Sequence, residues 1–185
     1  DFGDYLFEEQ TQELDWGNEI AAFRWNHLFG EQLFSNTTLT YSRYKYSSLN
    51  IYDYYSEFEE EIDAEYSFSR FKSSIRDIGL KIDFEYYPTS QQQVLFGGGF
   101  LLRTFESGEL AAAFDEIDSQ ADIEEAQETF DEVYEPPFFK TQEVNFYVED
   151  RISITDNFSM LGGIHLAAFF TNDKTYLIPQ PRLSF

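Results

Sequence analysis

The fold is decided by residues 75–105, IRDIGLKIDFEYYPTSQQQVLFGGGFLLRTF, in which two alternating runs flank a short polar turn. In the first run one parity is wholly apolar and comprises Ile78, Leu80, Ile82, Phe84 and Tyr86. The other parity is charged apart from Gly79 and comprises Asp77, Lys81, Asp83 and Glu85. A period of two places these sets on opposite faces of one β-strand. This stretch therefore predicts a strand with one apolar and one polar face.

The alternation recurs over segments longer than the usual strand of about five or six residues. A soluble sandwich could show such a pattern once, against its core. Strands of roughly 9–11 residues, apolar outside and polar inside, are typical of proteins that span an outer membrane. The pattern favours an all-β fold, an antiparallel transmembrane β-barrel segment.

About seven strands are expected, joined by connections that alternate between short and long. The expected strands are residues 16–27, 33–46, 75–87, 94–105, 141–155, 159–171 and 177–185. Short turns are expected at 30–32, 88–91 and 156–157, and a short polar loop at 172–175. Because outer-membrane barrels have short periplasmic turns and long extracellular loops, the acidic segments 47–74 and 106–139 are expected outside the cell. Parts of the first segment, such as Glu65–Phe71, could extend the neighbouring strands beyond the membrane.

The second acidic segment also carries apolar residues at helical spacing, which predicts one or two short amphipathic helices. These residues are Leu110, Phe114, Ile117, Ile123, Ala126, Phe130 and Val133. The stripe through Phe114 and Phe130 would pack the loop on itself or contact a partner lipoprotein at the cell surface.

Composition excludes several classes of protein. The chain has 185 residues, a formal charge of −23 and 19% aromatic residues. The acidity leaves no basic patch to neutralise phosphates, so nucleic-acid binding is disfavoured. The chain has no run of eighteen apolar residues, so no transmembrane helix is predicted. It also has no cysteine, which excludes disulfides and thiol-based metal sites.

Charged residues on the polar parity are the candidates for the lining of an aqueous lumen. They are Arg24, Lys81, Asp83, Arg103, Glu143, Arg151 and His165. In the extracellular loops the candidates for ligand contact are Tyr52, Tyr54, Tyr55, Phe114 and Phe130. The Gly97–Gly99 run lowers strand propensity, so something is expected to approach closely or bend there.

No catalytic site, metal site or cofactor is predicted. Neither histidine belongs to a cluster with metal-ligand spacing, and His27 is expected at a membrane interface. The acidic loops could hold Ca²⁺, but they lack the glycine and the spacing of an EF-hand, and a solvated surface is the alternative that we favour. Glu143 and Glu149 are expected to line a passage rather than to catalyse hydrolysis.

A closed bacterial barrel usually has an even number of strands. An open sheet edge in lipid would leave backbone groups unsatisfied at several kcal/mol each. Residues 1–185 are therefore expected to form part of a larger barrel and to be a fragment of a longer chain.

Three ordered sets of short strings resemble the TonB-dependent outer-membrane receptors, in particular their SusC-like branch in Bacteroidetes. The first set is Trp16–Asn18, Arg24–Phe29 and Leu33–Thr38. The second is Ser73–Asp77, Asp83–Pro88 and Phe96-Gly97, and the third is Glu143, Tyr147, Glu149-Asp150, Gly162-Gly163 and Pro181–Ser184. Together they cover about two thirds of the chain. The resemblance implies the middle of a 22-stranded barrel, without the plug domain, the segment that contacts TonB or the remaining strands.

The resemblance implies a cell outer membrane protein of a Gram-negative bacterium that imports a specific ligand with energy delivered through TonB. Its expected partners are TonB, through the plug, and the lipid of the outer membrane, with a surface lipoprotein as a further candidate. The acidic loops favour a cationic, neutral or proteinaceous ligand, and glycan, peptide and metal-complex cargo remain open. Alternatives are a passive porin or structural barrel, and a soluble acidic β-sandwich adhesin.

Overall fold

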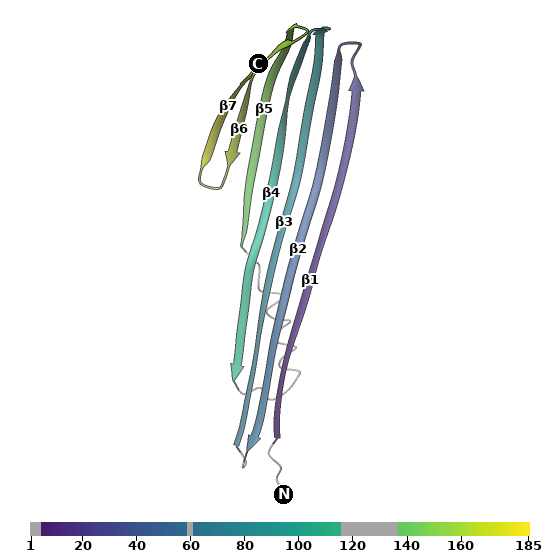
Figure 1. The fold of residues 1–185 in the computed structure, drawn as a ribbon. Helices are drawn as coiled ribbons and strands as arrows, with labels where there is room; N and C mark the ends of the chain where they lie inside the picture. The colour runs from purple at the N-terminus through teal and green to yellow at the C-terminus, as the bar shows by residue number, and fades with distance from the viewer. Residues whose placement is uncertain (1–4, 59–60, 116–136) are drawn as a thin grey trace. The chain divides into compact units, whose positions relative to one another are not determined.

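The computed structural model describes residues 5–58, 61–115 and 137–185, which fold into strands. The strands are β1 (Tyr5–Leu28), β2 (Leu33–Phe58), β3 (Glu61–Thr89), β4 (Gln92–Asp115), β5 (Phe138–Thr155), β6 (Phe158–Phe170) and β7 (Thr175–Ser184). Each strand pairs with its neighbours in chain order, in one antiparallel sheet of seven strands (Figure 1). The all-β fold and its seven strands are confirmed.

The first four strands are much longer than the sequence pattern predicts. β2 and β3 continue through most of residues 47–74, which we expected to be a loop with strand extensions only in parts such as Glu65–Phe71. Tyrosine and phenylalanine fit a pleated surface well, and segments such as Ile51–Tyr55 hold enough of them to continue the strand despite their acidity. The side of the membrane on which these extensions lie stays a prediction.

The predicted helix is wrong for its first residues. Leu110 and Phe114 lie in β4, which continues to Asp115, so their spacing does not mark a helix there. The rest of the predicted helical segment, residues 116–136, lies outside the described residues. No helix in the described part of the chain has the length and apolar character to cross a membrane.

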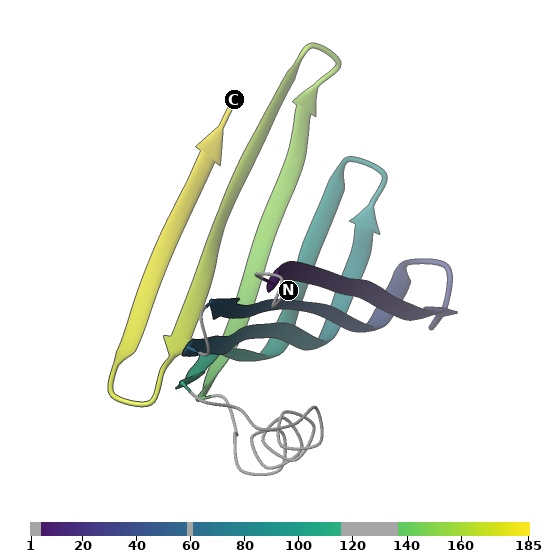
Figure 2. The same ribbon diagram turned by 90° about the horizontal axis from the view of Figure 1, so that it is seen from below.

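Contacts divide the chain into two compact units. The first unit comprises Asp1–Asn18, Tyr44–Ser74 and Glu106–Phe138, and the second comprises Glu19–Arg43, Ile75–Phe105 and Phe139–Phe185. The second unit contains the short connections between consecutive strands and is a single layer of strands (Figure 2).

Backbone hydrogen bonds join neighbouring hairpins of the second unit at their turns. The Tyr87 amide donates to the carbonyl of Gln32 at 2.8 Å, and the Ser153 amide donates to the carbonyl of Gln91 at 2.8 Å. These bonds place the first three short turns along one end of the second unit. The short turns predicted at 30–32, 88–91 and 156–157 thus lie together, whereas most of the long connection predicted at 47–74 is strand.

One face of the second unit is apolar and uncovered. On β3 the side chains of Ile78, Leu80 and Tyr86 are 42%, 40% and 38% exposed. The same face carries Phe96, Phe100, Phe146, Val148, Ile164 and Leu166, all exposed. Among the described residues there is no second sheet or helix to cover them, whereas a soluble sandwich would bury this face.

The buried apolar side chains of the described residues lie in the first unit. Tyr66 and Phe68 are each 4% exposed, with ring centroids 6.4 Å apart. Tyr46 and Phe71 meet edge to face at 5.9 Å, and the Ser69 hydroxyl donates to Glu109 at 3.1 Å. This small cluster stabilises the strands of the first unit.

Candidate functional site

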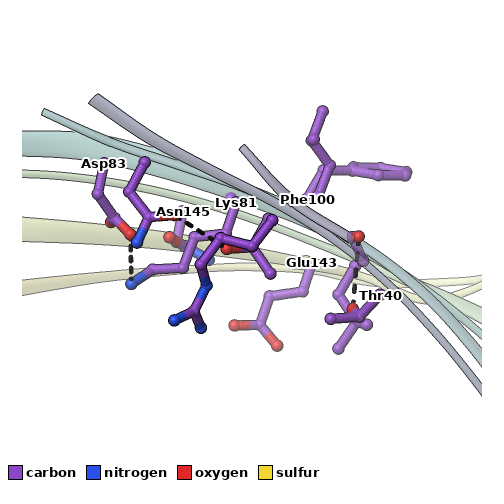
Figure 3. A pocket seen from close by; sticks show the side chains of 13 residues that line it. Thr40, Lys81, Asp83, Phe100, Glu143 and Asn145 are labelled. Atoms are coloured by element: carbon purple, nitrogen blue, oxygen red, sulfur yellow. Dashed lines mark hydrogen bonds and ion pairs between the residues drawn. The ribbon is translucent and has the colours of Figure 1, made fainter. Parts of the chain in front are cut away.

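The polar face of the second unit contains a hollow of about 400 Å³ to which β1, β2, β3, β4 and β5 all contribute (Figure 3). Its polar lining consists of Arg24, Asn36, Thr38, Thr40, Lys81, Asp83, Glu143 and Asn145, with Gly79 and Gly99 between them. The ring of Phe100 points to the other side of the strands (Figure 3). Because successive side chains of a strand point to opposite faces, the hollow and the apolar face lie on opposite sides of the sheet.

Charges of both signs surround this hollow. The Lys81 ammonium lies 3.0 Å from the Asp83 carboxylate, two residues along the same strand and on the same face. The Thr40 hydroxyl donates to the carbonyl of Gly79 at 3.4 Å. The balanced charge and the several hydroxyl and amide groups suit hydrogen bonding to a polar surface or ligand.

Gly97 allows two side chains to meet above it. The Tyr147 hydroxyl on β5 donates to Asp83 on β3 at 2.6 Å, and β4 lies between these strands. A Cβ atom at Gly97 would overlap the carbonyl oxygen of Ile82 and lie 3.0 Å from the Tyr147 ring. The missing side chain is therefore what allows Tyr147 to reach Asp83.

Gly163 likewise allows two side chains to meet above it, in this case from β5 and β7. Gly163 on β6 lies opposite Glu149 on β5 and Arg182 on β7. The Arg182 guanidinium reaches across it to the Glu149 carboxylate at 2.6 Å. A Cβ atom at Gly163 would lie 2.8 Å from Cγ of Glu149.

The rest of the glycine run is also occupied by side chains of β5. A Cβ atom at Gly98 would lie 2.9 Å from the Phe146 ring, and one at Gly99 would lie 3.0 Å from the Asn145 side chain. The close approach expected at Gly97–Gly99 therefore comes from the neighbouring strand of the same sheet.

The seven predicted lumen residues do not form one cluster. Arg24, Lys81, Asp83 and Glu143 line the hollow. Arg103 makes two hydrogen bonds to Asp77, at 2.9 and 2.8 Å. The Nδ1 atom of His165 lies 3.3 Å from Oε1 of Gln180, and the ring centroids of His165 and Tyr147 are 6.4 Å apart. Arg151 is exposed on β5.

Sequence reasoning missed the partners of these residues. Asp77, Tyr147, Gln180 and Arg182 complete the pairs, and none of them was singled out as a candidate. The sequence signal for these pairs was a glycine on the polar face of a strand, because a side chain from a neighbouring strand can cross the strand at a glycine.

In the described part of the chain, the geometry shows no metal centre. Within residues 5–58, 61–115 and 137–185 no group of three or more histidine, cysteine, aspartate or glutamate side chains could hold a metal ion. Residues 116–136, which belong to the acidic segment that could hold Ca²⁺, lie outside the described residues.

His27 belongs to a row of aromatic rings beside the short turns. Its ring lies 5.4 Å from that of Trp25 and 4.4 Å, edge to face, from that of Phe29. Phe29 continues the row to Phe84 at 6.5 Å, which stacks on Phe96 at 5.0 Å. This environment is apolar and aromatic, unlike that of a metal ligand.

The structure describes only some of the residues that we expected to contact a ligand outside the cell. Tyr52, Tyr54 and Tyr55 lie half-buried on β2, in the first unit. Partial burial, followed by the charges of Glu8 and Glu65, raises the pKa of the Tyr52 phenol. Phe114 lies on β4 without a described side chain, and Phe130 lies outside the described residues.

Replacing Tyr147 with phenylalanine is expected to lower the free energy of unfolding by about 1.5 kcal/mol, since a hydrogen bond to a charged group is lost. The full-length protein would unfold at a lower temperature, measured as loss of resistance to SDS. Tyr86→Phe is the matched control, because Tyr86 lies on the apolar face. Equal melting of both variants would contradict the role given to the Tyr147–Asp83 bond.

Neither the family models nor the curated proteins contain a match to this chain. Solved structures do match. The RagAB peptide importer in its closed-closed state superposes with a TM-score of 0.57 at 8% identity, over 92% of this chain and 19% of that one.

Two further matches are the FrpB iron transporter of Neisseria meningitidis and the outer-membrane ferripyoverdine receptor of Pseudomonas aeruginosa. Their TM-scores are 0.40 and 0.38, at 12% and 9% identity, over 92% and 95% of this chain. This chain spans about a third of each of them, 33% in both cases. At 8% identity the likeness to RagAB establishes the fold alone, an antiparallel all-β sheet similar to part of that structure.

Proposed function

We propose that this chain is a wall segment of a TonB-dependent importer in the outer membrane of a Gram-negative bacterium. The single observation that carries the proposal is the apolar face of the second unit, uncovered on one side of a sheet whose other side is polar. The likeness to the RagAB peptide importer supports it.

Lipid is the medium that this apolar face requires. Soluble monomers rarely expose contiguous apolar patches larger than a few hundred Å², and this face runs along β3, β4, β5 and β6. Since burial of apolar surface stabilises by roughly 25 cal/mol per Å², such a face in water would carry a large penalty.

The row of Trp25, His27, Phe29, Phe84 and Phe96 fits the aromatic girdle of a barrel at its periplasmic interface. It lies beside the short turns, which are periplasmic in outer-membrane barrels. In this orientation the acidic segments 47–74 and 106–139 belong outside the cell, where their negative charge repels strongly anionic cargo.

The polar face in this account lines the interior of the barrel. Arg24, Lys81, Asp83 and Glu143 would contact the plug or cargo, while Arg103, Arg151 and His165 would line the same passage. The neighbours are transporters and receptors, which fits a protein that is not an enzyme. We infer TonB, acting through a plug domain, as the partner, with a surface lipoprotein as a further one.

The proposal is tested with the full-length protein in its own bacterium. The protein should sediment with the outer membrane, resist extraction by salt and carbonate, and bind the purified periplasmic domain of TonB. In planar bilayers it should show no steady open-channel current, because a plug closes the barrel. Steady conductance without TonB binding would indicate a passive porin, and release from cells without detergent would indicate a soluble adhesin; either result overturns the proposal.

A further inference from the structure

The edge of β7 that faces away from β6 is unusual, and its character follows from the register of the last hairpin. The Thr171 amide donates to the carbonyl of Lys174 at 2.9 Å across the turn. From there β6 and β7 pair without interruption, from Phe170 opposite Thr175 to Leu161 opposite Ser184.

Hydrogen-bonded and non-hydrogen-bonded pairs alternate along an antiparallel ladder. Counting from the Thr171–Lys174 pair, the even-numbered residues of β7 direct their backbone groups towards β6. The odd-numbered residues direct their N–H and C=O groups away from β6, to the far edge; they are Thr175, Leu177, Pro179, Pro181 and Leu183.

Both prolines of β7 belong to the set that points away. Pro179 lies opposite Leu166 and Pro181 lies opposite Ile164, each in a pair that makes no backbone hydrogen bond. Proline has no N–H group and is tolerated in a strand only where that group is not needed by the neighbour. This explains how β7 holds two prolines while its pairing with β6 stays complete.

The consequence appears at the far edge. Over the seven residues from Leu177 to Leu183, about 20 Å of strand, the far edge has carbonyl acceptors but no amide donor between its ends. Side chains next to the gap do not replace the missing donors, since Gln180 lies against His165 and Arg182 is bound to Glu149.

We propose that the far edge of β7 forms a hydrogen-bond gap in the barrel wall, centred on Pro179 and Pro181, where the wall parts most readily. The proposal rests on the proposed function, because a barrel must continue with a strand at this edge. The partner that fits the edge is a strand bonded to β7 at two separate stretches, around Thr175–Leu177 and at Leu183. Its carbonyls opposite the prolines receive no backbone donor from β7.

Hydrogen–deuterium exchange of the full-length protein in lipid nanodiscs tests this gap. Pro179→Val with Pro181→Val adds two amides to the peptide that spans residues 177–183. We expect both new amides to exchange about tenfold or more slowly than the turn amides of residues 172–173, because they fill the gap and bond to the neighbouring strand. The temperature at which the barrel loses its resistance to SDS should rise as well.

Ile178→Val is the matched control, because its amide points to β6 and the substitution adds no donor. It should leave the exchange of the peptide and the melting temperature unchanged. Rapid exchange of both new amides with unchanged melting would overturn the gap, since no strand would then stand opposite the prolines. Sedimentation of the same variants with the outer membrane reports on the proposed function independently of this outcome.

Discussion

Replacing Gly97 with alanine is expected to prevent the barrel from reaching its native stability. The added methyl group would overlap the backbone carbonyl of Ile82, and backbone cannot move aside as a flexible side chain can. It would also displace the Tyr147 ring and so weaken the hydrogen bond to Asp83. Overpacking and the weakened bond to a charged group together amount to about 3 kcal/mol.

The measurement is the yield and melting temperature of the full-length protein in the outer membrane, read as SDS-resistant, heat-modifiable material. Gly162→Ala is the matched control, because a Cβ atom there would meet no atom within 4 Å. Gly97→Ala should lose most of the folded protein, whereas Gly162→Ala should retain it. Equal yields would mean that β3 and β5 do not approach Gly97 of β4 as closely as described.

Arginine in place of Ile164 is expected to destabilise the protein by about 2–4 kcal/mol, the cost of this residue on the lipid face of a barrel at the bilayer midplane. Ile164 lies at the centre of β6 and is 42% exposed on the apolar face. In water an exposed isoleucine would tolerate this change, since most surface substitutions stay within about 0.5 kcal/mol. The size of the effect therefore distinguishes lipid from water.

Arginine at the adjacent residue His165 is the matched control for this experiment. His165 lies on the polar face opposite Tyr147 and Gln180, where a charged side chain can remain hydrated. Comparison of SDS-resistant yield should show a large loss for Ile164→Arg and a small one for His165→Arg. Similar tolerance of both substitutions would be inconsistent with a lipid-exposed Ile164.

The sequence predicted the faces of the strands well because parity depends only on local alternation. Ile78 and Leu80 are exposed on one face, and Lys81 and Asp83 line the hollow on the other. The strand ends were harder to predict. Acidic residues around Tyr52–Tyr55 suggested a loop, although their aromatic neighbours continue the strand.

The partners of the polar side chains could not be predicted, because they depend on the register between strands distant in sequence. Tyr147 and Asp83 are 64 residues apart, and a shift of one residue would place Tyr147 on the apolar face. Gly97 marked a point of close approach, but the sequence did not indicate that the approaching group was a side chain of β5. The role of Pro179 and Pro181 likewise appeared only once the β6–β7 register was known.

The central claim is that lipid contacts the apolar face, and spin-label accessibility along residues 78–86 tests it most directly. The sequence has no cysteine, so a single cysteine placed at each of these positions of the full-length protein in liposomes carries the label. We predict that even-numbered positions collide with oxygen dissolved in lipid, and odd-numbered positions with a water-soluble nickel chelate. If the even-numbered positions were shielded from both reagents, protein would cover the face and the account would be contradicted.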